Sequence, residues 1–229
     1  MAGNHDIPLT NFSPTDYSHE TTFRNFVKEF HGRELPALRR FTHPDGRHIE
    51  LLAINSVRLR TPSLMNYGYV DWSQHDVVLR RVPKPDAKTT RIAVLHHHVT
   101  TASRIEPVET SGAALPASVS VTIDAGEVLE GLQSSGFRLV MHGHQHVPRI
   151  SYLSRGYLRD RSYQLAGLDE LLYVVAGGSA GAKRERLSAE VPYNTYNILR
   201  LNAGEATVTA RQFGPEQKAT THFEAKLRL

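Results

Sequence analysis

Two short apolar segments of this chain each run directly into a cluster of histidines. Arg91–Leu95 (RIAVL) precedes His96, His97 and His98, and Arg138–Met141 (RLVM) precedes His142, His144 and His146. Both segments have the length and apolar content of buried strands. Because the carboxyl ends of strands in an open α/β sheet meet at one crevice, we expect the two histidine clusters to lie close together. This pairing limits the folds that the chain can adopt to those with adjacent buried strands.

The rest of the pattern alternates helices and strands and predicts an α/β fold. A well-marked helix spans 124–135, where Asp124 can act as the N-cap and Glu127 completes a capping box. The last part of the chain changes to period two, which predicts three antiparallel strands. We find no internal repeat and no linker, so residues 1–229 are expected to form a single domain. The other expected elements are helices at 21–30 and 73–82, strands at 49–55 and 171–175, and final strands at 195–201, 206–213 and 219–229.

Composition limits the compartment and the partners. The chain is 40% hydrophobic and 22% charged and has no cysteine, which suits a globular protein of the reducing cytoplasm. No segment approaches the roughly 20 apolar residues that a membrane helix needs. The net charge of +4 comes from scattered Lys and Arg, so nucleic acid is not indicated as a partner.

The spacing of the second histidine cluster suits a metal site. His144 and His146 are separated by Gln145, and in a turn this spacing can direct two imidazoles at two neighbouring ions. Neutral imidazole binds Zn, Mn and Fe. A histidine pair in a loop is by itself more often ordinary surface chemistry. Two clusters at strand ends, together with Gly3-Asn4-His5-Asp6, favour a metal centre instead.

The three segments GNHD (3–6), VLHHHVT (94–100) and VMHGHQHVP (140–148) resemble, in order, the later motifs of the calcineurin-like metallophosphoesterases. The resemblance implies an α/β two-sheet sandwich flanked by helices, with the final strands in the second sheet. It also implies a phosphodiesterase or phosphatase that uses two divalent ions (Mn, Fe or Zn) and a water activated by them. The substrate would be a phosphoester of unspecified kind.

The first motif would supply one ligand and the catalytic pair. Asn4 resembles the asparagine that binds one metal ion. His5 resembles the histidine that contacts the phosphoryl group and protonates the leaving oxygen, and Asp6 resembles the carboxylate that orients its ring.

The later motifs would supply the remaining ligands. The family takes one ligand from the histidine run, for which we expect His97, with His96 as the runner-up because Val99 replaces a common proline. If the strand continues through the run, His96 and His98 face one way and His97 the other, so a His96 ring aimed at His144 would reverse the choice. His98 could face the substrate. His144 and His146 match the two ligands of Gly-His-x-His, one for each metal ion.

The family's first two motifs, Asp-x-His and Gly-Asp, occur nowhere in the chain. Three metal ligands are therefore missing, including the carboxylate that bridges the ions. We interpret the chain as an N-terminally truncated enzyme without its first strands. Alone, it is expected to hold one ion or none, to be essentially inactive on a generic phosphodiester, and to need an oligomer or partner chain to cover apolar strands left at the sheet edge. The alternatives are a non-catalytic binding or scaffold module, and a subunit whose site another chain completes.

Overall fold

The computed structural model describes most of the chain from residue 36 onward. The described residues are 36–57, 67–80, 82–100, 121–144, 146–154, 156–159, 162–165, 171–181, 187, 191–214 and 218–229. The expected helix at 21–30 and the motif residues Asn4, His5 and Asp6 lie outside these ranges.

The larger sheet has six strands in the order β1-β2-β3-β4-β8-β5. Its inner strands β2, β3, β4 and β8 are parallel, whereas β1 and β5 pair antiparallel at the two edges. The parallel strands therefore place their carboxyl ends along one side of the sheet. The bounds are β1 Ala37–Thr42, β2 His48–Ala53, β3 Thr89–Val94, β4 Phe137–His142, β5 Arg149–Leu153 and β8 Leu172–Ala176.

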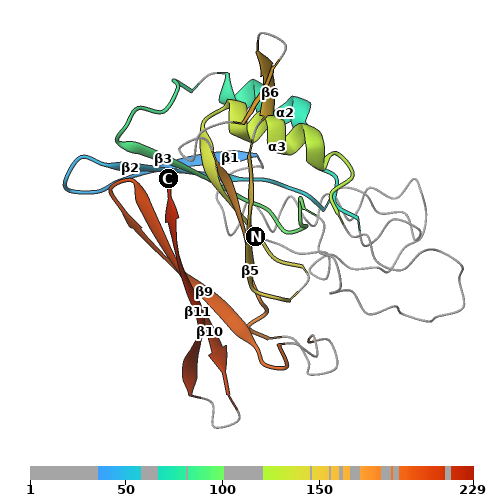
Figure 1. Ribbon diagram of the computed structural model, residues 1–229, viewed down its shortest axis with the longest axis vertical. Helices are drawn as coiled ribbons and strands as arrows, with labels where there is room; N and C mark the ends of the chain where they lie inside the picture. The colour runs from blue at the N-terminus through green and yellow to red at the C-terminus, as the bar shows by residue number, and fades with distance from the viewer. Residues whose placement is uncertain are drawn as a thin grey trace, which may run out of the picture.

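The end of the chain forms a second, antiparallel sheet in the order β11-β10-β9, as the period-two pattern predicts. Its strands are β9 Thr195–Asn202, β10 Glu205–Phe213 and β11 Ala219–Arg228. A separate hairpin joins β6 (Gly156–Arg159) and β7 (Ser162–Leu165). In Figure 1 the three C-terminal strands lie on one side of the larger sheet, and the helices α2 (Trp72–Leu79) and α3 (Ala125–Ser134) lie on the other.

Successive side chains of the inner strands are buried on opposite faces of the larger sheet. Ala93 and Val140 belong to the cluster that includes Val128 and Leu132 of α3. Ile92, one residue before Ala93, belongs to the opposite cluster with the strands of the second sheet. Since successive strand residues point to opposite faces, continuous apolar runs such as RIAVL are what a doubly covered strand requires. The described part is therefore an α/β arrangement with two sheets and few helices.

Asp124 acts differently from the expected helix cap. α3 begins at Ala125, and the Asp124 side chain makes no capping hydrogen bond to its own helix. Its carboxylate instead accepts hydrogen bonds from the backbone N–H groups of Val70 (3.0 Å) and Asp71 (2.8 Å). The capping-box prediction is wrong in this respect, because the carboxylate fastens α3 to the segment that leads into α2.

The apolar strands that end near Leu95 and Met141 do not lie at an edge. β3 pairs with β2 and β4, and β4 pairs with β3 and β8. The expectation of an uncovered edge at these strands is therefore wrong for the described sheet, since β1 and β5 form the edges. Whether further strands belong to the fold stays a prediction.

A buried ion pair connects β2 with β3. The Arg91 Nε donates to Glu50 Oε2 at 2.7 Å, and both side chains are 2% exposed. Arg91 also donates to the carbonyl oxygens of Ser135 (2.6 Å) and Pro83 (2.5 Å), and Arg40 of β1 contacts the other carboxylate oxygen at 2.7 Å. Each carboxylate oxygen of Glu50 and each guanidinium nitrogen of Arg91 therefore has a hydrogen-bond partner, which is the condition under which such a pair is tolerated.

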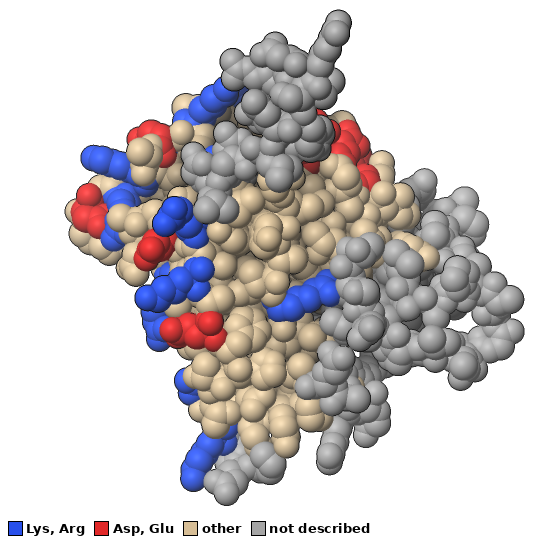
Figure 2. Space-filling view, in the orientation of Figure 1, with Lys and Arg blue, Asp and Glu red and all other residues tan. Residues whose placement is uncertain are grey.

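The surface carries charges of both signs. In Figure 2, Lys and Arg lie mainly along one side of the visible face and alternate there with Asp and Glu. Among the described residues, no helix has both the length and the apolar character required to cross a membrane.

Removing one half of the buried ion pair should destabilise the fold strongly. Glu50→Leu would leave the buried Arg91 guanidinium without its carboxylate, and loss of one partner of such a pair typically costs about 3–5 kcal/mol in free energy of unfolding. Urea-induced unfolding measures this change. Asp45→Ala, which removes an exposed pair with Arg47, is the matched control and should leave the unfolding midpoint nearly unchanged. Equal effects of the two substitutions would contradict the structural role of Glu50.

Candidate metal site

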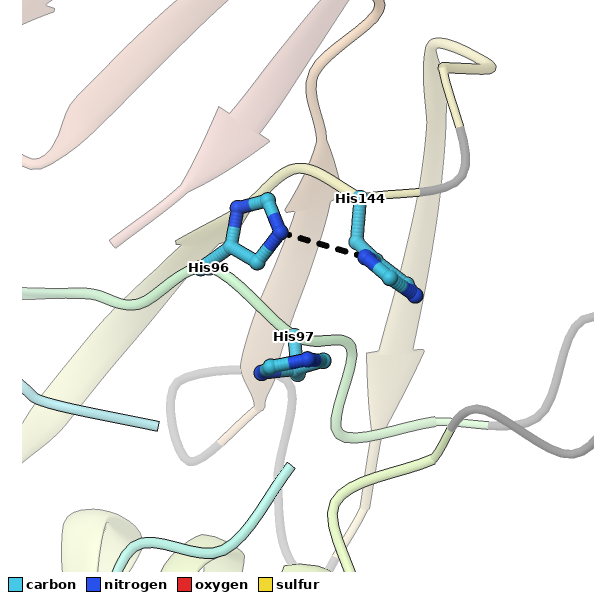
Figure 3. Close-up of side chains that lie close together, drawn as sticks. All are labelled: His96, His97 and His144. Carbon is cyan, nitrogen blue, oxygen red and sulfur yellow. Dashed lines mark hydrogen bonds between the residues drawn. The ribbon is translucent and has the colours of Figure 1, made fainter. Parts of the chain in front are cut away.

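Three histidines from the two sequence clusters meet at the carboxyl ends of β3 and β4. His96 and His97 follow the end of β3, and His144 follows the end of β4. One nitrogen of each ring lies within 4.8 Å of the others, and Figure 3 shows the three rings around a common centre. The convergence follows from the parallel pairing of β3 with β4, which places the ends of these adjacent strands side by side.

The two histidine loops contact each other through backbone and side chains. The His96 Nε2 and His144 Nδ1 atoms are 3.1 Å apart, so one of them donates a hydrogen bond to the other. The backbone N–H of Gly143 donates to the His96 carbonyl at 3.0 Å. The ring centroids of His97 and His144 are 4.7 Å apart. These contacts hold the three rings close together.

His97 is the most enclosed of the three rings, with no exposed surface. Its backbone N–H donates to the Ser56 hydroxyl at 3.0 Å, and the same hydroxyl lies 3.1 Å from its Nδ1. Gly68 lies against the ring, because a Cβ at this position would be 2.6 Å from the His97 Cβ. The close approach therefore requires glycine at position 68. The Nε2 of His97 is buried and has no hydrogen-bond partner among the described residues.

Burial keeps His97, His98 and His142 neutral. Burial, followed by the neighbouring rings of His144, His96 and His98, lowers the pKa of His97 to about 2. Burial likewise lowers the pKa of His98 to about 3, with His142, His144 and Arg149 as further causes. For His142, burial lowers the pKa to about 4. Neutral imidazole is the form that binds metal ions, so these rings are available as ligands at neutral pH.

His98 and His142 lie beside the three converging rings. Their ring centroids are 6.0 Å apart, and that of His98 is 6.1 Å from His144. His98 is 1% exposed and His142 5% exposed. The suggestion that His98 faces the substrate stays a prediction.

The turn after β4 has an unusual backbone. His144 and His146 both have positive φ values, 73° and 60°. This left-handed region is disfavoured for residues with a Cβ, and such strain concentrates at functional sites. His146 is not one of the three converging histidines. Its expected place at another metal ion stays a prediction.

The donor set fits one divalent ion. Zn–N bonds of about 2.0–2.1 Å in tetrahedral geometry place two ligand nitrogens roughly 3.3 Å apart. The 3.1 Å between His96 Nε2 and His144 Nδ1 is close to this separation. The partnerless Nε2 of His97 is a third buried nitrogen that an ion could satisfy. Three imidazoles with one open position form a known type of catalytic zinc site.

Both His96 and His97 approach His144. The His96 ring shares a 3.1 Å hydrogen bond with His144, and the His97 ring centroid lies 4.7 Å from that of His144. The alternation argument does not apply, because β3 ends at Val94 and the histidines follow in a turn. Both His96 and His97 therefore belong to the candidate site. Which of them binds an ion, together with the roles of Asn4, His5 and Asp6 outside the described residues, stays a prediction.

Sequence reasoning missed Ser56, which bridges the backbone of His96 and His97. Its hydroxyl accepts their N–H groups at 3.2 and 3.0 Å. Ser56 follows the predicted strand at 49–55 directly, and its place at the carboxyl end of a strand neighbouring β3 was the available signal.

Comparison with known proteins gives no family assignment. No family model and no curated protein match the chain. Similar solved structures include GAP50, the anchor in the inner membrane complex of Plasmodium, with 13% identity and a TM-score of 0.40 over 84% of this chain and 53% of that one. A putative 5'-nucleotidase from Staphylococcus aureus has 9% identity and a TM-score of 0.28 over 83% of this chain and 29% of that one.

A third similar structure is wild-type Vps29 from Entamoeba histolytica complexed with Zn²⁺. It has 11% identity and a TM-score of 0.28, and the match covers 77% of this chain and 98% of that one. The chain thus spans only 53% of GAP50 and 29% of the nucleotidase. All three TM-scores lie below 0.5, and the similarity does not identify a function.

The buried neutral histidines predict a pH-dependent stability. Their folded-state pKa values lie below the ordinary value of 6.5, so the unfolded chain binds protons that the folded chain excludes. The free energy of unfolding should therefore be unaffected above about pH 6.5 and fall as the pH drops from there toward 4. Urea unfolding in the presence of a chelator, repeated across this range, measures the slope.

His142→Asn should reduce that slope by up to about 1.4 kcal/mol per pH unit, the share of one proton. His43→Gln is the control, because the His43 side chain is 59% exposed. A slope that stays the same in His142→Asn would show that His142 is not held neutral by the fold.

Proposed function

We propose that this chain is a metal-dependent phosphoester hydrolase that holds a divalent ion with His96, His97 and His144. The observation that carries the proposal is the convergence of three imidazole nitrogens within 4.8 Å at the ends of two adjacent parallel strands. This position is where open α/β sheets bind their ligands. The reaction class rests on the three motifs GNHD, HHH and GHQH, which resemble metallophosphoesterase motifs in type and order.

Both His96 and His97 are proposed as ligands, whereas the family resemblance implies one ligand from the histidine run. Sequence analysis took a single ligand from the histidine run, which left too few ligands for a stable site. With both His96 and His97 beside His144, three imidazole donors are available to one ion. Bound there, the ion would polarise a phosphoryl oxygen and lower the pKa of a water at its open position.

The protein residues have separate tasks in this proposal. The hydrogen bonds of Ser56 and Gly143 fix the backbone of the two histidine loops. His98 lies next to these rings and is the candidate to contact the phosphoester. His5, oriented by Asp6, is proposed to protonate the leaving oxygen.

The described cluster contains no carboxylate. A bound divalent ion would therefore keep its full charge, which favours an anionic ligand such as a phosphoester at the open position. A second ion, as the sequence resemblance implies, would use His146 and Asn4. We expect hydrolysis by this chain alone to be slow, because the family's bridging carboxylate is absent from its sequence.

Metal titration tests the proposal directly. The metal-free chain should bind one Zn²⁺ per molecule, measured by competition with a chromophoric chelator. His144→Ala should weaken binding by more than the about 10–100-fold that loss of a ligand's hydrogen-bond partner typically costs. His222→Ala, at an exposed histidine of β11, is the matched control and should bind Zn²⁺ as the unchanged chain does.

Hydrolysis of bis-p-nitrophenyl phosphate with added Mn²⁺ or Zn²⁺ tests the reaction class. Turnover should require the metal and disappear in His144→Ala. Zinc binding without any turnover would instead support a non-catalytic binding module. Turnover that persists in His144→Ala or with excess chelator would contradict the proposed site.

A further inference from the structure

Ser56 connects the segment that follows β2 with the histidine loop that follows β3. It follows β2, is completely buried, and accepts hydrogen bonds from the backbone N–H groups of His96 (3.2 Å) and His97 (3.0 Å). The same hydroxyl oxygen lies 3.1 Å from the Nδ1 of His97. Three groups of the histidine loop therefore contact one oxygen atom.

Counting hydrogens determines the direction of the third contact. A serine hydroxyl has two acceptor lone pairs and one hydrogen. The two backbone N–H groups can only donate, so they occupy both lone pairs. The hydroxyl hydrogen is then donated to Nδ1, and a neutral His97 must carry its own hydrogen on Nε2. This Nε2 is the buried atom that has no partner among the described residues.

The tautomer held by Ser56 is opposite to the one that metal binding at Nε2 requires. An ion at Nε2 needs the lone pair of that atom, so the ring hydrogen must move to Nδ1. The Ser56 hydroxyl would then rotate and accept from Nδ1–H, as groups behind ligating histidines commonly do. The exchange moves one hydrogen from Nε2 to Nδ1, so it releases no net proton from His97.

We propose that Ser56 is a positioning residue that holds metal-free His97 in its Nε2–H form and accepts from Nδ1–H when an ion is bound. A hydroxyl can do both, whereas a backbone carbonyl can only accept. In the metal-bound form three donors would share one oxygen, so the longer contact from the His96 N–H should weaken. Binding at His97 would thereby be coupled to the position of His96. This inference rests on the proposed function, because it assumes that His97 is a ligand.

Nitrogen-15 NMR of histidine-labelled protein reads the tautomer independently of activity. In the metal-free chain, His97 should be in the Nε2–H form, and added Zn²⁺ should convert it to the Nδ1–H form. Ser56→Ala should shift metal-free His97 away from a pure Nε2–H form, and Ser56→Thr, which keeps the hydroxyl, should restore it. The His97 signals are assigned with His97→Gln. A metal-free His97 in the Nδ1–H form, or a tautomer unchanged in Ser56→Ala, would overturn the inference.

Zinc affinity provides the second measurement. Ser56→Ala should weaken binding about 10–100-fold, whereas Ser134→Ala, which removes an exposed hydroxyl at the end of α3, should not. Circular dichroism checks that each variant folds. Unchanged zinc affinity in a folded Ser56→Ala would overturn the inference and leave the proposed function intact. If the unchanged chain binds no zinc, the proposed function fails, and the metal-bound half of this inference fails with it.

Discussion

The inner strands of the larger sheet are covered on both faces, and the site depends on this constraint. Ile92 and Ala93 of β3 pack into hydrophobic clusters on opposite faces of the sheet. Such a strand can therefore offer polar side chains to a ligand only beyond its buried part. The parallel pairing of β3 with β4 makes their ends coincide. Polar residues that follow these two strands therefore lie close together although they are far apart in the sequence. The histidine cluster is therefore a consequence of how the core is built.

The same constraint explains the buried charges at the other end of these strands. Glu50 and Arg91 pair across β2 and β3 in register, and both are almost completely buried. An apolar pair of similar volume could be as stable. What the ion pair adds is a link from the sheet to the carbonyl oxygens of Pro83 and Ser135, which lie on segments adjoining α2 and α3. The sheet and its helical layer are thus fixed relative to each other nearer the amino ends of these strands, away from the histidines.

Sequence reasoning located the inner strands well because burial on both faces leaves an unbroken apolar run. β3, β4 and β8 lie within two residues of their predicted bounds. The edge strand β1 (ALRRFT) was missed, since its mostly exposed side chains follow no apolar period. At the site, the meeting of the two clusters could be predicted, but the orientation of single rings could not. His96, His97 and His98 lie in a turn, and the contact with Ser56 joins residues 41 positions apart.

The strained turn that carries His144 has a consequence for how this protein could be altered. His144 and His146 are both held at positive φ, at a cost of roughly 1–2 kcal/mol each. Glycine at position 144 would relieve that strain and would remove an imidazole of the candidate site. Selection for heat resistance alone would therefore favour variants that have lost the site, and a thermostability screen of this chain needs metal binding as a second criterion.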